Sequence, residues 1–223
     1  MRLAALFSGG KDSTYALYLA KKRGYKIAYL ATVISKNPDS YMYHTENVGT
    51  TMFLSSALGI QLSTKVSFGE KEKEVDDLRI LLKGLDVEGV VCGAIESEYQ
   101  KKRVKMVCKE LGKKLFTPLW HKDNEKYLRK MVKDKFVVMI VKVAADGFDE
   151  SWLGRIIDAK CIDDLIKLKE KHGISIVGEG GEYETIVLDC PLFQKKVEVT
   201  DSEKKWEGNS GSFIIKNAKF VDK

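Results

Sequence analysis

Short apolar runs alternate with amphipathic helical patterns over the first 120 residues of the chain. Apolar runs of this kind are typical of buried strands, and strands that alternate with helices join through right-handed crossovers. The sequence therefore predicts an α/β fold with a mostly parallel sheet. Strands are expected at 2–7, 27–34, 62–68, 88–93 and 114–117, and helices at 12–22, 46–58, 70–85 and 97–111.

The pattern changes after about residue 130. Residues 136–144 form a long apolar run, residues 164–172 have a helical pattern, and from residue 186 onward apolar and polar residues alternate. Alternation of this kind is typical of antiparallel strands with one face in water. We therefore predict two domains, a larger one at 1–130 and a smaller α+β domain at 131–223.

The most specific motif follows the first predicted strand and opens the first helix. Glycines let the backbone come close to a ligand, and the N–H groups and dipole of a helix start favour an anion. A lysine adds a cation and the serines add hydroxyl donors, so the motif predicts a phosphate-binding loop. A glycine-rich turn that only caps the helix is the alternative. The motif consists of Ser8, Gly9, Gly10, Lys11, Asp12 and Ser13.

The motif does not fit the Walker A loop of other nucleotide-binding proteins. Walker A requires a glycine where Ala5 stands, and Ser or Thr directly after the lysine, where Asp12 stands.

The hexapeptide resembles the pyrophosphate loop, or PP-loop, of the ATP pyrophosphatases, which cleave ATP between its α- and β-phosphates. This resemblance implies a Rossmann-like five-stranded parallel sheet of the adenine nucleotide alpha hydrolase type, Mg²⁺ and ATP, and an adenylated intermediate. It also implies that the loop holds the pyrophosphate, with Lys11 and Asp12 as catalytic residues. Asp12 either faces the metal or caps the helix.

Three other segments of the first domain are candidates for nucleotide contacts. Gly93 and Glu96 follow the fourth strand, which lies beside the first strand in such folds. Arg103 lies further along and either meets a phosphate or is solvated. In the family, the end of the second strand lies near the adenosine, so Tyr43 and His44 would line that pocket. The alternative is a loop in which His44 is exposed or caps the following helix.

An acidic, glycine-containing segment at residues 179–185 is the most distinctive motif of the second half. Clustered carboxylates repel one another unless a metal ion or a cationic substrate group compensates them. A solvated acidic turn is the alternative. Residues 146–154 form a second acidic and aromatic segment, which contains Trp152.

Together with Thr117–Trp120, these motifs resemble the diphthine–ammonia ligase family over nearly the whole chain. The family uses ATP and ammonium to convert diphthine to diphthamide on elongation factor 2. The resemblance implies that the diphthine carboxylate is adenylated and then amidated. Diphthine carries a trimethylammonium group, which aromatic rings and carboxylates bind well. We expect it to face Glu179, Glu182, Tyr183, Glu184 and Trp152.

Other functions of the same fold remain open. They are a PP-loop ligase for a small carboxylic acid or for tRNA, and a module that binds adenylate without catalysis. Four cysteines without a C-x-x-C spacing argue against a tRNA thiolase. The formal net charge of +6 is mild, and we expect no direct contact with nucleic acid.

The sequence also bears on location and assembly. The N-terminus lacks the pattern of a signal peptide, and no apolar run is long enough to span a bilayer. We therefore expect a cytoplasmic protein with no membrane contact. A monomer and a homodimer both remain open.

Overall fold

The computed structural model describes residues 1–35, 49–68 and 73–223. Within these residues the chain divides into two compact units, Met1–Trp120 and His121–Lys223. The boundary expected from the sequence, between residues 130 and 131, falls inside helix α5 (Asn124–Lys133) of the second unit.

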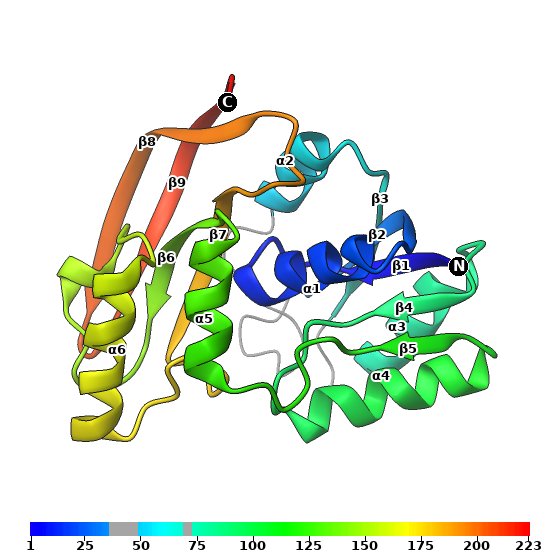
Figure 1. Ribbon diagram of the computed structural model, residues 1–223, viewed down its shortest axis with the longest axis horizontal. Helices are drawn as coiled ribbons and strands as arrows, with labels where there is room; N and C mark the ends of the chain where they lie inside the picture. The colour runs from blue at the N-terminus through cyan, green and yellow to red at the C-terminus, as the bar shows by residue number, and fades with distance from the viewer. Residues whose placement is uncertain (36–48, 69–72) are drawn as a thin grey trace. The chain divides into compact units, whose positions relative to one another are not determined.

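The first unit contains a five-stranded parallel sheet with the order β3-β2-β1-β4-β5 (Figure 1). From β1 the chain first adds β2 and β3 on one side and then β4 and β5 on the other, so the switch point of the topology lies between β1 and β4. Sheets of this kind bind ligands at the switch point, beyond the carboxyl ends of the strands. The α/β fold and the five parallel strands expected from the sequence are confirmed. The strands are β1 (Arg2–Leu6), β2 (Lys26–Ser35), β3 (Leu62–Ser67), β4 (Gly89–Val91) and β5 (Lys114–Phe116).

In the part of the chain that the structure describes, four helices connect these strands. Strand β1 is the central strand of the sheet. Ala4 of β1 belongs to the core that α3 and α4 form against the sheet. Leu3 and Ala5 are also fully buried, and they alternate with Ala4 to the opposite face. A strand buried on both faces explains the unbroken apolar run in the sequence. The helices are α1 (Lys11–Lys22), α2 (Gly49–Leu58), α3 (Lys73–Lys83) and α4 (Glu98–Glu110).

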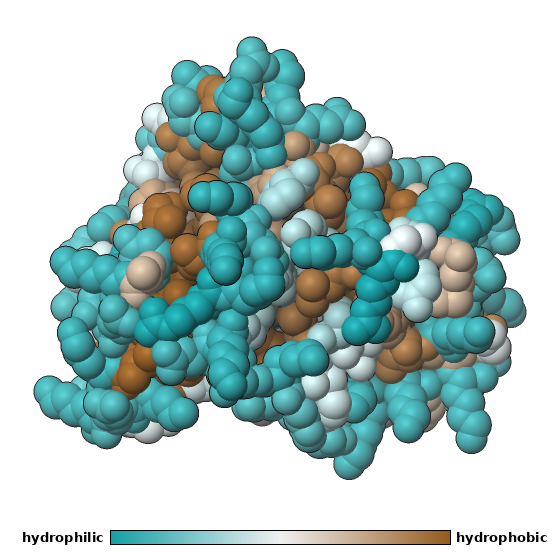
Figure 2. All heavy atoms as spheres, viewed as in Figure 1, coloured by the Kyte–Doolittle hydropathy of each residue, from teal (hydrophilic) through white to brown (hydrophobic). Residues whose placement is uncertain are grey.

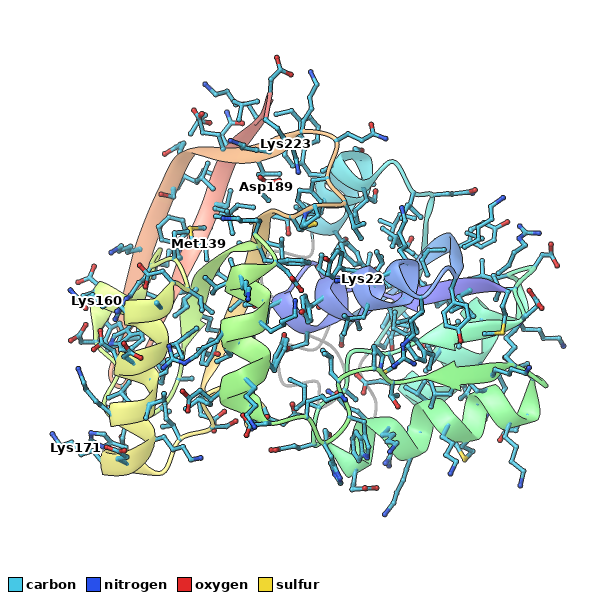
Figure 3. The ribbon with its side chains drawn as sticks, viewed as in Figure 1. Lys22, Met139, Lys160, Lys171, Asp189 and Lys223 are labelled. Carbon is cyan, nitrogen blue, oxygen red and sulfur yellow. The ribbon has the colours of Figure 1, made fainter. Side chains whose placement is uncertain are left out.

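The second unit combines an antiparallel sheet, of order β7-β6-β9-β8, with helices (Figure 1). The α+β architecture expected from the sequence is therefore confirmed. At the end of the chain, Lys223 Nζ lies 2.7 Å from an Asp189 carboxylate oxygen and ties the C-terminus to β7 (Figure 3). In addition to α5, this unit contains β6 (Val137–Val143), a 3₁₀ turn at Glu150–Trp152, α6 (Ala159–His172), β7 (Tyr183–Asp189), β8 (Lys196–Glu207) and β9 (Ser210–Val221).

Two helical features of the second unit differ from the expectation. Helix α5 was not expected, because only a narrow stripe of apolar residues lies among its many charges. Asp123 caps it by accepting a hydrogen bond from the Lys126 N–H at 2.8 Å. Helix α6 begins five residues earlier than expected, because the Asp158 carboxylate accepts the Cys161 N–H at 2.7 Å.

All four cysteines are buried as free thiols. Burial raises the pKa of Cys108, Cys161 and Cys190 to about 11, because an apolar environment disfavours the thiolate. These three residues therefore remain protonated at neutral pH and are poor nucleophiles. No helix among the described residues combines the length and the apolar composition needed to cross a bilayer.

The cysteine environments predict slow thiol chemistry in the folded protein. A thiol with a pKa of about 11 is ionised in roughly one molecule in a thousand at pH 8. We expect a thiol-specific disulfide reagent to modify Cys108, Cys161 and Cys190 at least about a hundredfold more slowly in the native chain than in guanidinium. Rapid native modification of any of the three, identified by mass spectrometry, would contradict these environments.

Candidate functional site

The loop at residues 8–13 joins the end of β1 to the start of α1. Gly9 has a φ of +81°, a conformation that residues with a side chain rarely adopt, and an added Cβ would lie 2.6 Å from Leu54 of α2. Gly10 is the N-cap of α1, and no side chain makes a capping hydrogen bond there. Neither Asp12 nor Ser8 occupies the N-cap position, and anion binding by the loop stays a prediction.

The hydroxyl groups of the loop lie together. Ser8 Oγ and Ser13 Oγ are 3.1 Å apart, and Ser13 Oγ also donates to the Gly10 carbonyl at 3.2 Å. Thr14 Oγ1 donates to the same carbonyl at 2.8 Å. These bonds fold the loop back on the first turn of α1, which places both serine hydroxyls beside the positive end of the helix dipole.

Lys11 is the buried cation of the loop. Its side chain is 3% exposed, and its Nζ lies 2.9 Å from an Asp12 carboxylate oxygen. Burial of an ammonium group requires an opposite charge, which Asp12 supplies. The Asp12 side chain is 33% exposed, so it also reaches solvent. Cation, carboxylate and helix start thus converge within one turn.

Gly93, beyond the end of β4, lies directly against the first turn of α1. A Cβ atom at this position would be 2.7 Å from the Asp12 carbonyl carbon and 2.8 Å from the Ser13 nitrogen. Only glycine allows the two backbones to approach this closely. The pairing of β1 with β4 thus brings the two segments together, as the sequence predicted.

The other nucleotide candidates are placed less directly. Glu96 is exposed, and the next residue, Ser97, caps α4 by accepting the Gln100 N–H at 3.3 Å. The Arg103 guanidinium stacks over the Tyr99 ring at 3.4 Å, so both belong to one helix face. A phosphate contact by Arg103 stays a prediction. Tyr43 and His44 lie outside the described residues.

Thr32 of β2 supports the loop and was not singled out from the sequence. It is 7% exposed, and its hydroxyl donates to the Phe7 carbonyl at 2.5 Å. The Phe7 N–H donates to the Ala31 carbonyl at 2.9 Å. Strand β2 therefore holds the residue that precedes the loop by both backbone groups. The sequence did contain a signal for this role, because a hydroxyl group within a buried apolar strand requires a hydrogen-bond partner.

In the second unit, the Glu182 carboxylate organises the acidic segment. One oxygen accepts the Ser175 N–H and the other accepts the Gly180 N–H, each at 2.8 Å. The neighbouring Tyr183 is 2% exposed, and its hydroxyl donates to the Ile176 carbonyl at 2.7 Å. Glu182 and Tyr183 thus fix the path of the chain, and any contact that they make with a substrate stays a prediction.

The two distinctive segments of the second unit meet through aromatic rings. The Phe148 ring centroid lies 5.0 Å from that of Trp152 and 6.2 Å from that of Tyr183. All three rings are buried, and the Arg155 guanidinium lies 4.4 Å from the Trp152 centroid. One face of the indole therefore already carries a cation. This packing gives Trp152 a structural role, and its contact with a substrate stays a prediction.

The remaining carboxylates of the acidic segment are half-buried. Glu184 Oε1 lies 3.6 Å from Lys142 Nζ on the paired strand β6, and Glu179 precedes the two glycines of the segment.

Across residues 1–35, 49–68 and 73–223, no three His, Cys, Asp or Glu side chains converge as ligands of a metal ion.

Comparison with known protein families identifies both halves of the chain. The profile of the Diphthamide synthase N-terminal domain matches residues 1–115, and that of the Diphthamide synthase C-terminal domain matches residues 123–221.

Curated proteins with similar sequences carry one activity name. The diphthine–ammonia ligase of Homo sapiens is 41% identical over 226 residues, which cover 91% of this chain and 84% of that protein. The Mus musculus diphthine–ammonia ligase is 39% identical with the same coverage. The Schizosaccharomyces pombe diphthine–ammonia ligase is 37% identical, and the match spans 37% of that longer protein.

The hydrogen bond from Thr32 to the residue before the loop predicts a measurable effect on nucleotide binding. Thr32→Val leaves the buried Phe7 carbonyl without its side-chain donor, which costs about 1–3 kcal/mol. We expect ATP binding, measured by calorimetry, to weaken by roughly fivefold or more. Thr32→Ser keeps the hydroxyl and should bind as the parent does. Equal affinities in the Val and Ser variants would show that the bond does not position the loop.

Proposed function

Because this chain belongs to the diphthamide synthase family, we propose that it is an ATP-dependent diphthine–ammonia ligase that releases AMP and pyrophosphate. Its acid substrate would be the diphthine side chain of elongation factor 2, and its nitrogen source ammonium. The observation that carries the proposal is the loop at residues 8–13, where buried Lys11 lies beside Asp12 at the start of α1.

The loop suits attack by a carboxylate on ATP. The substrate carboxylate would attack the α-phosphorus, forming a new P–O bond as the bond to pyrophosphate breaks. Both reactants are anionic, so the step requires compensating positive charge. Lys11 and the N-terminus of α1 supply that charge, and the hydroxyls of Ser8 and Ser13 lie beside it. We assign Lys11 and Asp12 to catalysis and the rest of the loop to the pyrophosphate.

The second step would form the amide. Ammonia attacks the carbonyl carbon of the acyl-adenylate, AMP leaves with the electrons of the acyl–oxygen bond, and ammonia loses a proton to give the neutral amide. The buried, protonated thiols of Cys108, Cys161 and Cys190 are poorly suited to nucleophilic delivery of the nitrogen. Free ammonium is therefore the proposed source.

Magnesium fits the loop as an ion that arrives with the nucleotide. Mg²⁺ in nucleotide sites is usually held by one or two carboxylates together with substrate phosphates. Asp12 is the carboxylate of the loop, and it is one-third exposed. We propose Asp12 as the protein ligand. When bound, the ion would neutralise charge on the phosphates.

The second unit is the proposed site for the diphthine cation. Glu179 and Glu184 supply carboxylates on either side of a turn that Glu182 holds by its two hydrogen bonds to backbone N–H groups. Tyr183 and Trp152 pack behind that turn. Carboxylates attract a trimethylammonium group, and the buried rings of Tyr183 and Trp152 would support the turn that carries them. We therefore assign the nucleotide to the first domain and this cation to the second.

The cellular location follows from the same proposal. An enzyme acting on elongation factor 2 would work in the cytoplasm, without contact to a membrane or to nucleic acid.

The proposed nucleotide site also includes contacts from other segments of the first domain. These contacts would come from Gly93, Glu96, Arg103, Tyr43 and His44.

The first test is the dependence of ATP cleavage on the factor. With Mg²⁺, ATP, ammonium and diphthine-bearing elongation factor 2, we expect AMP and pyrophosphate to form only when the factor is present. Lys11→Ala should lower the rate by about a hundredfold or more, as does the loss of a charge-stabilising group in other enzymes. Lys21→Ala, on the same helix but exposed, is the control.

The outcomes separate the alternative functions. Cleavage without dependence on the factor would indicate a ligase for a small acid or for tRNA. Binding of AMP without any cleavage would indicate a module that only senses adenylate.

The acidic segment predicts that nucleotide binding and amidation can be separated. The pair Glu182→Gln and Glu184→Gln should weaken amidation about tenfold or more, because Glu184 no longer supplies a counter-charge to the cationic substrate and Glu182 no longer accepts both backbone N–H groups of the turn. ATP affinity should be unchanged. Glu170→Gln with Glu207→Gln removes two exposed carboxylates of the same unit and is the control. Parallel loss of ATP binding and amidation would disprove a substrate role for the segment.

A further inference from the structure

The net positive charge of the chain is concentrated in one segment. Residues 99–114 carry seven Lys and Arg side chains against one carboxylate, that of Glu110. Their net charge of +6 equals the formal net charge of all 223 residues, so the rest of the sequence is balanced. The segment runs from the second residue of α4, directly after Glu98, to the first residue of β5.

Within this segment, α4 presents a row of exposed lysines. Lys102, Lys105 and Lys109 follow one another at helical spacing, and all three are exposed. Met106 lies next to them and is 42% exposed, which is unusual for a large apolar side chain. Figure 2 shows a mostly hydrophilic surface over α4, at the lower right. We call these three lysines and Met106 the α4 basic stripe.

Other cations of the segment have structural partners. Lys101 Nζ lies 3.5 Å from the centroid of the Trp120 ring, and Lys113 Nζ donates to the carbonyls of Leu85 and Val87 at 3.0 and 2.8 Å. The carboxylate of Glu110 pairs with Arg79 at 2.7 Å.

The lysines of the stripe lack comparable partners. Lys102 Nζ lies 3.7 Å from a Glu98 carboxylate oxygen, and the two side chains are 75% and 56% exposed. Ion pairs as exposed as this one contribute little to stability. Among the residues that the structure describes, none offers Lys105 or Lys109 a carboxylate within salt-bridge distance. Lys105 and Lys109 therefore present uncompensated positive charge to solvent, and the charge of Lys102 is compensated only by a weak, exposed pair.

The stripe begins close to the proposed nucleotide site. Helix α4 follows the segment in which Gly93 touches Asp12 and Ser13. At a rise of about 1.5 Å per residue, Lys102 lies roughly 6 Å beyond the first residue of α4, and Lys109 about 10 Å further. A partner that covers the stripe would thus lie within reach of the loop at residues 8–13, on the same unit.

We propose that the α4 basic stripe docks an acidic surface of the protein substrate, an inference that rests on the proposed function. Clustered charge of one sign attracts a partner of opposite charge and accelerates its association. Met106 adds an apolar contact at the centre of the row. A protein fits better than single-stranded nucleic acid, because the nearby rings of Tyr99 and Trp120 are already covered by cations and offer no stacking platform for bases.

The test is a charge reversal with a matched control. Lys102→Glu, Lys105→Glu and Lys109→Glu are combined in one variant. Lys160→Glu, Lys169→Glu and Lys171→Glu are combined in another, because these exposed lysines lie on α6 of the other unit (Figure 3 labels Lys160 and Lys171). Amidation of diphthine-bearing elongation factor 2 is measured at 50 and 300 mM salt, and circular dichroism verifies that both variants fold. A triple Lys→Gln variant of α4 serves if the reversal does not fold.

We expect the α4 reversal to lower kcat/KM for the factor at least about tenfold at 50 mM salt, mainly through KM. The deficit should shrink at 300 mM salt, because salt screens exposed charges. The KM for ATP should be unchanged, and the α6 control should stay within about twofold of the parent.

Three results would overturn the proposal. Equal losses in the α4 and α6 variants would mean that only net charge matters. An unaffected kcat/KM, with lost binding of a short RNA, would assign the stripe to nucleic acid. A parent chain that does not amidate the factor at all would overturn the proposed function together with the docking surface, whereas the first two results leave that function intact.

Discussion

The parallel pairing of β1 with both β2 and β4 holds the loop at residues 8–13 in place. Strand β2 binds the backbone of Phe7, directly before the loop, through Thr32 and Ala31. Beyond the end of β4, Gly93 lies against the first turn of α1, directly after the loop. The loop is thus fixed on both sides, so its N–H groups, hydroxyls and Lys11 are arranged before a ligand arrives, and little ordering entropy remains to be lost on binding.

A different kind of interaction organises the second unit. There the Glu182 carboxylate accepts hydrogen bonds from the N–H groups of Ser175 and Gly180, a role that backbone carbonyls have in helices and sheets. Behind this turn, the rings of Phe148, Trp152 and Tyr183 join the two acidic segments into one packed cluster. A rigid turn can hold neighbouring carboxylates at fixed positions, which the recognition of a cation without hydrogen-bond donors requires.

The two units also differ in charge. Residues 121–223 contain equal numbers of basic and acidic side chains, so the net charge of +6 lies entirely in the first unit. The basic side chains of α4 divide by their contacts. Some stack on rings or bind carbonyl groups, whereas Lys102, Lys105 and Lys109 face solvent. Net charge alone therefore says little about a binding surface, and the neighbours of each cation decide whether its charge is available.

The sequence by itself determined the parallel sheet, the antiparallel second unit and the loop with Lys11, because these depend on local periodicity and on adjacent residues. Only the tertiary structure decided which residues support the loop, since the contacts of Thr32 and Gly93 join segments far apart in the chain. The same holds for Trp152, where a ring that looked suited to bind a cation is buried beneath Arg155. Helix α5 was missed because its apolar stripe is narrow and gains its stability from burial within the second unit. Motifs record which groups a site requires, whereas burial and long-range contacts decide which of those groups remain accessible to a ligand.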